Sequence, residues 1–346
     1  MKKGGRILEK HSNIQRSKRK LIILFIVLII TIFISFQLGR YPISPKMLFR
    51  SLFAIITNNT DTIPKEVLTV LLKIRVPRIL SAILIGAALS MSGSSYQALF
   101  QNPMVSPDIL GASQGAGFGA ALGLLWYFSY QTTALMAFAI GLTAVFIAYM
   151  ISTKFKVDRI LGLVLSGMMV GSIFSSMISF IKLVADPDNT LPAITYWLMG
   201  SLASIRNADV KLVFIPILIG IVLTLSIRWK MNLLTMGEDE ARSMGVNTKM
   251  TRIIIVFAST LMTAACVSVS GMIGWVGLVI PHFARMVVGN DYRYVLPASG
   301  LIGAIFLLIV DNLARNLTTA EIPLGILTSF VGAPLFIYLI LKRGYD

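Results

Sequence analysis

The chain has 346 residues, of which 56% are hydrophobic and 13% are charged. A soluble domain carries roughly 25% charged residues, so this composition excludes an ordinary soluble enzyme and indicates a polytopic membrane protein. The formal net charge of +16 could suggest a nucleic-acid partner, but the basic residues concentrate beside apolar runs, where they mark membrane topology instead.

The first 20 residues hold eight Lys or Arg and one acid, Glu9. Residues 21–39 follow without a charge and are long enough to cross about 30 Å of hydrocarbon. A cleaved signal peptide would have a shorter apolar core and a small-residue cleavage site, and this segment has neither. We therefore expect a basic cytoplasmic tail over 1–20, followed by a single transmembrane domain over 21–346 that begins with a retained helix.

Nine further apolar segments complete a predicted all-α fold of about ten transmembrane helices; they are 79–99, 109–127, 132–152, 160–182, 210–227, 253–271, 275–288, 295–314 and 324–341. The stretch 190–205 is apolar but too short to span, which favours a re-entrant or interfacial segment. Ten spans place both termini in the cytoplasm and most of the 31 Lys and Arg residues inside.

Small residues gather on the second and third predicted helices, from Ser90 to Ser95 and from Gly111 to Gly119. They permit close helix packing in lipid, or they could line a pore. A glycine-rich run also suggests a nucleotide loop. No Gly-Lys dipeptide occurs in the chain, so a Walker phosphate loop is excluded.

Several ordered motifs carry a family resemblance; they are Arg75-x-Pro77-Arg78, Gly86-Ala-Ala-Leu-x-x-Ser-Gly93, Gln97, Asn102-Pro103, Pro107, Leu110-Gly111, GEDEARSMG over 237–245, GMIGWVGLVIPHFAR over 271–285 and EIPLGILTSFVGAP over 321–334. Together they cover nearly everything after Arg75. In this order they resemble the permeases that import iron-siderophores, heme and vitamin B12, which are type II ABC importers.

This resemblance implies a second permease subunit, either a copy or a paralogue, around a central path in the cell membrane. It also implies two separate subunits that hydrolyse ATP and an extracytoplasmic binding protein that delivers substrate. We expect an iron(III)-siderophore substrate, with cobalamin or heme as the alternative. The chain itself is expected to be no enzyme and to bind no cofactor, metal or nucleic acid.

Two other function classes fit the residues less well. An ion-driven secondary transporter normally keeps an ionisable group near the bilayer midplane, and none lies well inside a predicted span. A membrane enzyme would need an arrangement such as a nucleophile with a histidine and an acid, which the predicted helices lack.

Arg75, Arg78 and Arg315 lie at predicted outer helix ends. The resemblance implies that they pair with acidic residues of the binding protein. Arginine suits such a dock because its planar fork can engage a carboxylate in two hydrogen bonds. The alternatives are snorkelling to the membrane interface and, for Arg315, a local pair with Asp311 four residues earlier.

The predicted inner loop 228–252 contains a helix signal. Thr235 to Glu238 predicts a capping box and Gly245 a C-terminal stop, with Glu238 and Arg242 paired four apart. We expect a helix of about nine residues that exposes Met236, Ala241 and Met244. The resemblance implies that it is the coupling helix, which contacts the ATPase through Gly237, Glu238, Ala241, Arg242 and Gly245.

Candidates for the translocation path are Ser94, Gln97, Gln114 and the polar faces of the predicted spans 160–182 and 275–288. Candidates for the gates are Asn102, Pro103, Pro281 and His282, together with Lys156 to Arg159. Each has an equally plausible packing role. Pro281 removes a backbone donor within its helix, which places His282 at a predicted kink. The only other histidine is His11, in the tail, so His282 is a poor metal candidate.

Overall fold

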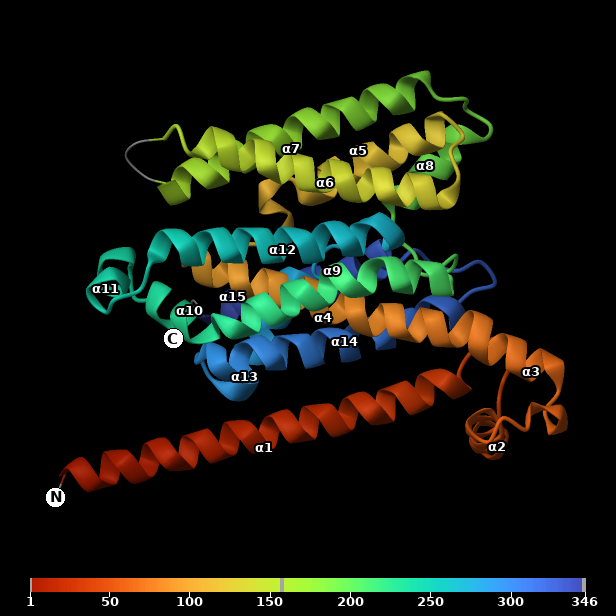
Figure 1. Ribbon diagram of the computed structural model, residues 1–346, viewed down its shortest axis with the longest axis horizontal. Helices are drawn as coiled ribbons and strands as arrows, with labels where there is room; N and C mark the ends of the chain where they lie inside the picture. Colours follow the sequence, from red (N-terminus) through yellow and green to blue (C-terminus); the bar gives the residue numbers. More distant parts are fainter. Residues whose placement is uncertain (1, 156–158, 344–346) are drawn as a thin grey trace.

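The computed structural model describes residues 2–155 and 159–343, and all of its regular elements within these ranges are helices. Ten helices run side by side (Figure 1): α1 (Lys2–Gln37), α4 (Val76–Leu99), α5 (Ala112–Leu125), α6 (Tyr130–Ser152), α7 (Arg159–Val184), α9 (Asn207–Ser226), α12 (Thr248–Ser270), α13 (Val276–Val288), α14 (Tyr292–Asn316) and α15 (Leu324–Arg343). Each predicted span coincides with one of them. Among the described residues, six are long and apolar enough to cross a membrane, namely α1, α6, α7, α9, α12 and α14.

Short elements connect these helices: α2 (Pro45–Ile56), η1 (Thr60–Thr62), α3 (Lys65–Thr69), η2 (Val70–Arg75), η3 (Pro107–Leu110), α8 (Thr190–Leu198), α10 (Arg228–Leu234) and α11 (Glu238–Ser243). The segment predicted to be too short to span is α8. In Figure 1, α10 and α11 lie at the end of the bundle where α1 begins, and α2 and α3 lie at the opposite end.

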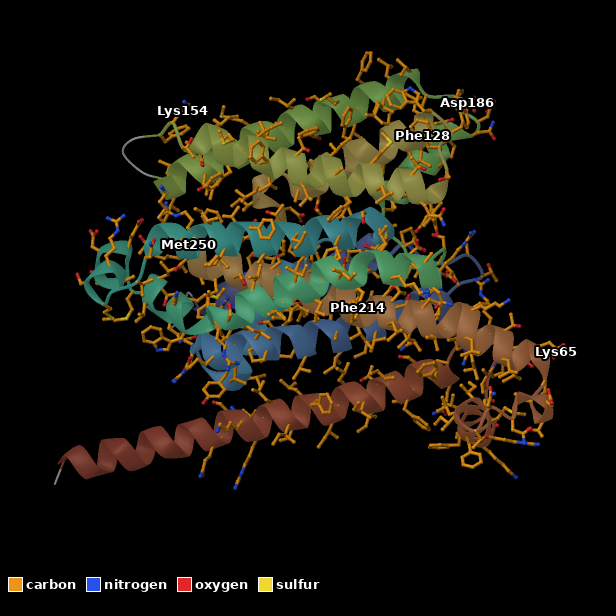
Figure 2. All side chains as sticks on the ribbon, in the orientation of Figure 1. Lys65, Phe128, Lys154, Asp186, Phe214 and Met250 are labelled. Carbon is orange, nitrogen blue, oxygen red and sulfur yellow. The ribbon has the colours of Figure 1, made fainter. Side chains whose placement is uncertain are left out.

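Polar side chains mark the two ends of the bundle. Figure 2 shows Lys154 and Met250 near one end, and Lys65 and Asp186 at the other, while Phe214 lies midway along α9. Phe214 is exposed, as are Ile215, Leu218, Ile219 and Val222 of the same helix. Apolar side chains that are exposed in the middle and polar loops at both ends are the arrangement that a bilayer requires.

α4 is the central helix, and most of its residues are buried. It packs against α14, α12, α13 and α9, while α5, α6 and α7 form a layer on one side and α1 lies on the other (Figure 1). The close approach depends on glycine. A Cβ atom added to Gly93 would lie 1.8 Å from the carbonyl oxygen of Gly277 in α13. The small residues of α4 therefore serve close packing, one of the two roles that the sequence left open.

Candidate translocation and coupling sites

The three predicted docking arginines gather at the end of the bundle opposite α11, but all three are buried. Arg78 Nη2 lies 2.8 Å from Asp311 Oδ1 of α14 and 2.8 Å from Glu321 Oε2, just before α15. Its Nη1 donates to Glu321 Oε1 at 3.0 Å. One guanidinium thus joins α4, α14 and the segment that leads to α15.

The other two arginines hold the end of α1. Arg75 donates to the carbonyl oxygens of Phe36 and Tyr41, and Arg315 donates to the carbonyl oxygen of Ser35 at 2.9 Å. These carbonyls belong to the last turn of α1 and the segment after it, where helix carbonyls lack intrahelical partners. The local pair predicted from Asp311 to Arg315 is present, with Nε 3.8 Å from Oδ2. Docking by these arginines stays a prediction, and it requires their present contacts to be exchanged.

The predicted coupling helix is α11, which has six residues rather than nine. The capping box is wrong: Gly237 takes the N-cap position, and the Thr235 hydroxyl donates to the carbonyl of Asn232 instead. Gly245 follows the helix with φ +81°, as expected of a C-terminal stop. The helix is short because the turn of α10 continues to Thr235 and displaces the cap.

Glu238 organises this loop. Its Oε1 accepts from Arg242 Nη2 at 2.6 Å and from Thr248 Oγ1 at 3.0 Å, while its Oε2 lies 2.7 Å from Arg252 Nη2. Partial burial opposes ionisation, but Arg252, Thr248 and Arg242 outweigh it and lower the pKa of the Glu238 carboxyl. The predicted pair with Arg242 is confirmed, and α11 is tied to the start of α12.

One of the predicted coupling residues differs from the expectation in its exposure. Ala241 was expected to be exposed, but its side chain is fully buried against the rest of the loop. Exposed apolar side chains beside α11 include Met236, Met244 and Met250. A partner that covers α11 would therefore contact methionine, arginine and acidic side chains. Ala241 packs beneath this surface and would not touch the partner.

α10 fixes the coupling loop to the bundle. Asn232 Nδ2 donates to Asp291 Oδ1 at 2.8 Å, and Asn232 Oδ1 accepts from the backbone nitrogen of Tyr292 at 2.7 Å. Burial opposes ionisation of Asp291, but Arg293 and Asn232 prevail and lower the pKa of its carboxyl. This contact fastens α10 to the first turn of α14.

Gln97 joins three chain segments near the same end. Its Nε2 donates to the carbonyl oxygens of Val105 at 3.2 Å and Leu278 at 3.1 Å. Its Oε1 accepts from Arg285 Nη2 at 2.7 Å. Pro281 lies inside α13 between these contacts, and His282 beside it is half-buried. Gln97 is thus a structural hub in this conformation rather than a free path-lining group.

The turn after α4 carries the remaining predicted gate residues. Asn102 is exposed, and its Oδ1 accepts from the backbone nitrogen of Met104 at 2.9 Å around Pro103. This side-chain turn breaks the chain between α4 and η3. Residues 156–158 of the other predicted gate segment lie outside the described residues.

Ser94 and Gln114 differ in their surroundings. Ser94 is fully buried in α4. Gln114 of α5 is half-buried and lies beside Gly171 of α7, and its Oε1 is buried without a hydrogen-bond partner in the described part of the chain. Such an orphaned acceptor is costly unless water or a ligand reaches it. The Ser94 hydroxyl is also without a partner in the described part of the chain, so the two path candidates differ in burial alone, and the half-buried Gln114 is the more accessible.

The polar face that the sequence predicts on the span 160–182 is a stripe of hydroxyl side chains along α7. The exposed serines are Ser172, Ser175, Ser176 and Ser179. They recur at the spacing of one helix face, which was the available signal. Ser172 and Ser179 donate to carbonyls one turn earlier, at 2.8 and 3.1 Å. Exposed apolar side chains flank the stripe, chiefly Met168, Met169, Ile173 and Phe180.

Two grooves lie between helices of the bundle, and the first of them borders this stripe. One, of about 670 Å³, lies between α5 and α7 and is lined by Phe118, Leu122, Ser172, Ser176 and Phe180 among others. The second, of about 700 Å³, is formed by α8, α15 and the segment after α12, with Met199, Met272, Ser329 and Phe330. Both linings are apolar with a few hydroxyls. Among the residues that the structure describes, no carboxylate or basic side chain lines either groove.

A backbone junction lies beside the second groove. The nitrogen of Ser201 donates to the carbonyl of Ser270 at 2.7 Å, and the nitrogen of Leu324 donates to the carbonyl of Gly200 at 2.8 Å. Gly200 has φ +75° and Gly271 φ +67°, and a Cβ at Gly271 would lie 2.1 Å from the carbonyl oxygen of Trp197. Only glycine fits this meeting point of α8, α12 and α15.

Metal binding by the chain itself finds no support in the described ranges: between residues 2 and 155 and between 159 and 343, no three His, Cys, Asp or Glu side chains gather into a metal site. The single cysteine, Cys266, is fully buried in α12.

The sequence model of the FecCD transport family matches residues 27–342. The chain belongs to this family. Its fold is also that of a solved structure described as an inward-facing conformation of a metal-chelate type ABC transporter, with a TM-score of 0.85 and 37% sequence identity over 94% of this chain and 99% of that chain. The FecCD chain is thus the membrane-spanning permease of an ABC importer, a transport subunit with several passes through the membrane.

Relatives of this FecCD chain span almost its whole length. The molybdate import system permease protein of Haemophilus influenzae is 39% identical over 93% of this chain and 95% of its own. The hemin transport system permease protein of Yersinia pestis is 34% identical over 92% and 94%. A probable iron chelatin transport system permease protein of Helicobacter pylori is 37% identical over 79% and 82%.

Proposed function

We propose that this chain moves an iron(III)-siderophore type chelate into the cytoplasm, driven by ATP hydrolysis on two separate ATPase subunits. The observation that carries the proposal is the uncharged, hydroxyl-bearing face of α7 with the apolar groove beside it, together with the second apolar groove beside α15. A bulky chelate offers oxygen atoms and apolar surface together. A wall of serine and methionine contacts both without a fixed charge that would retain the cargo.

The path requires a second permease subunit, a copy of this chain or a paralogue. In a single chain the serine stripe of α7 is exposed on a helix that is otherwise apolar enough to span a membrane. Hydroxyls directed at lipid contribute little, whereas in an aqueous path they meet water and cargo. α7 and the groove beside α15 are therefore the faces we assign to the path.

The end of the bundle that carries α11 is assigned to the cytoplasm. The start of α1 lies at the same end (Figure 1), and its basic residues follow the positive-inside rule. We infer that both termini are cytoplasmic and that the ATPase covers α11. Gly237, Glu238, Arg242 and Gly245 shape the contact, and Met236 and Met244 enter it.

A substrate-binding protein would then dock at the opposite end, where Arg75, Arg78 and Arg315 lie. Acidic side chains of that protein would have to compete with Asp311 and Glu321 for Arg78. Docking in this form is an exchange of ion pairs, so it would loosen the contact between α4 and the start of α15. Charge reversal at Arg78 alone therefore tests stability and docking together, and Arg75 must be varied separately.

The substrate has named alternatives among the relatives. The similarity to the hemin permease makes heme a candidate substrate, and the similarity to the molybdate permease makes an oxyanion one. Cobalamin is another candidate, because a cobalamin import system permease protein of Halobacterium salinarum is 38% identical over 81% of this chain. Molybdate is the second candidate, because serine hydroxyls can donate to an oxyanion without a fixed positive charge.

The test is uptake in a strain that lacks its own importers and expresses the chain with its ATPase and binding protein. Radiolabelled ferric siderophores, molybdate, cobalamin and hemin are supplied separately. We expect one ferric siderophore to accumulate, and Ser176→Leu to lower its uptake at least tenfold. Thr143→Leu, at an exposed hydroxyl of α6 that donates to its own helix, is the matched control and should change uptake little.

Accumulation of molybdate, cobalamin or hemin alone would replace the substrate proposal and leave the permease role intact. Equal uptake by the two leucine variants would remove α7 from the path.

A further inference from the structure

α2 lies across the bundle axis. Figure 1 shows α2 nearly end-on, while α1 and α14 run across the picture from one side to the other. α2 lies at the end of the bundle opposite α11, beside α1 and away from α7. A helix perpendicular to membrane-spanning helices lies parallel to the membrane plane. The Ser44 hydroxyl caps its start by accepting from the backbone nitrogen of Met47 at 3.3 Å, and Pro45 occupies the first turn.

One face of α2 is packed against its own chain. Leu48, Ser51 and Ala54 are buried, in a small core that includes Val67 and Leu71 of the segment that returns to α4. Residues three apart share a helix face, so this buried stripe fixes the rotation of α2. The rest of its surface is thereby directed outward.

A second face of α2 is apolar and exposed. Phe49, Phe53 and Ile56 have exposed fractions of 61%, 69% and 82%, and Leu52 is exposed beside them. At about 100° per residue these side chains form one stripe. Exposed aromatic and aliphatic side chains at this spacing, on a helix whose opposite face is already packed, indicate an apolar partner.

A third face is basic. Lys46 and Arg50 are exposed, lie one turn apart and border the apolar stripe on its side toward Ala54. An apolar stripe beside a basic stripe is the arrangement of helices that lie in a membrane interface, with the apolar face among acyl chains and the cations at the headgroups.

The depth of α2 is fixed by a ring contact. Phe49 lies against Phe33 of α1, with ring centroids 5.3 Å apart. Phe33 belongs to the apolar span of α1, which ends at Gln37. Only 17% of the most apolar 18 residues of this span are buried. The apolar stripe of α2 is therefore level with the last turns of a lipid-facing span and continues its surface.

We propose that α2 is an interfacial helix that inserts Phe49, Phe53 and Ile56 among the acyl chains of the leaflet opposite the coupling loop, while Lys46 and Arg50 bind anionic lipid headgroups. The inference rests on the membrane-spanning arrangement and is independent of the substrate. Continuity with the exposed face of α1 and the charge of the basic stripe both favour lipid over a soluble partner.

The experiment uses the full chain, assembled with its ATPase, in lipid nanodiscs. Cys266→Ala first removes the one native thiol. Single nitroxide labels are then placed at Phe53→Cys, at Ile56→Cys and, as the matched control, at Asn59→Cys, an exposed position just beyond the helix. Collisions with oxygen report acyl chains, and collisions with a water-soluble nickel complex report water.

Labels at 53 and 56 should collide several-fold more with oxygen than with nickel, and the label at 59 should show the reverse. Equal nickel access at all three positions would overturn the proposal. Low collision with both reagents at 53 and 56 would also overturn it, because that result means that protein covers the stripe.

The charge is tested by lipid composition. With phosphatidylglycerol in the nanodisc, the label at 56 should move deeper than in pure phosphatidylcholine, and the Lys46→Gln/Arg50→Gln variant should lose this difference. Identical depths in both lipids would overturn the assignment of the basic stripe. Thermal unfolding of each labelled chain, matched to the unlabelled chain, establishes that the fold is retained.

Discussion

Arg78 of α4 and Asp311 of α14 form a buried ion pair across 233 positions of sequence, with Nη2 2.8 Å from Oδ1 and side-chain exposures of 7% and 1%. The pair closes the end of the bundle where α1, α4 and α14 meet. Glu321 completes it from the solvent side.

Breaking this pair should destabilise the chain strongly. Asp311→Asn leaves the Arg78 charge without its buried partner, and removal of one partner of a buried pair costs about 3–5 kcal/mol. The lower free energy of unfolding should appear as a lower thermal midpoint in detergent. Glu321→Gln is the control, because the Glu321 side chain is 23% exposed and its loss should cost less. Equal losses for the two variants would contradict this account.

Gly93→Ala should disrupt the crossing of α4 and α13. The new methyl group would lie 1.8 Å from the carbonyl oxygen of Gly277, so the helices must separate. Overpacking of this kind costs about 3 kcal/mol. Gly274→Ala is the matched control, since nothing lies within 4 Å of its added Cβ. Thermal unfolding of both variants is the measurement, and a normal midpoint for Gly93→Ala would be inconsistent with the packing described.

Gln97→Ala should loosen the segment around Pro281. It removes the donor to the Val105 and Leu278 carbonyls and the acceptor for Arg285. Each buried group left without a hydrogen-bond partner lowers the stability of the fold by about 1–3 kcal/mol. Hydrogen exchange over 276–288 should accelerate roughly tenfold for each 1.4 kcal/mol lost. Gln101→Ala removes a single bond to the Leu234 carbonyl and should leave this segment unchanged. Unaltered exchange in Gln97→Ala would be evidence against the hub.

Acid should release the coupling loop. The pKa of Glu238 lies below its ordinary value of 4.5, so its ion pairs stabilise the loop above that pH, and this stabilisation is lost as the pH falls through the folded pKa. A nitroxide at Asp239→Cys should gain mobility as the pH falls below about 4.5. Glu238→Gln should be mobile at every pH, whereas Glu240→Gln should titrate like the parent. A label whose mobility does not change with pH in the parent would disprove the role of Glu238.

Spans with strong apolar signals were predictable from the sequence, and local polar geometry was not. Residues 253–288 divide into α12 and α13 around Gly271, as their glycines indicated. The capping box at Thr235 failed because α10, which no periodic signal marked, continues to that position. A short cap competes with the preceding turn, and tertiary contacts decide the outcome.

The arginines show a different limit. Arg75, Arg78 and Arg315 were expected either to dock a binding protein, as the family resemblance implies, or to reach the membrane interface. Their partners, such as Asp311, Glu321 and the carbonyls at the end of α1, are distant in sequence and brought together only by the fold. α2 lies between the first two predicted spans and was not predicted, because its three faces appear only when the helix and its packed side are known.

The junction at Gly200 has a mechanical consequence. Hydrogen bonds between backbone atoms stretch little, and here they fasten the end of α8 to the end of α12 and the start of α15. Because these backbone segments touch directly, with no side chain between them, the three helix ends cannot easily move relative to one another. When this end of the transporter opens, the ends of α8, α12 and α15 should therefore move together as one rigid unit.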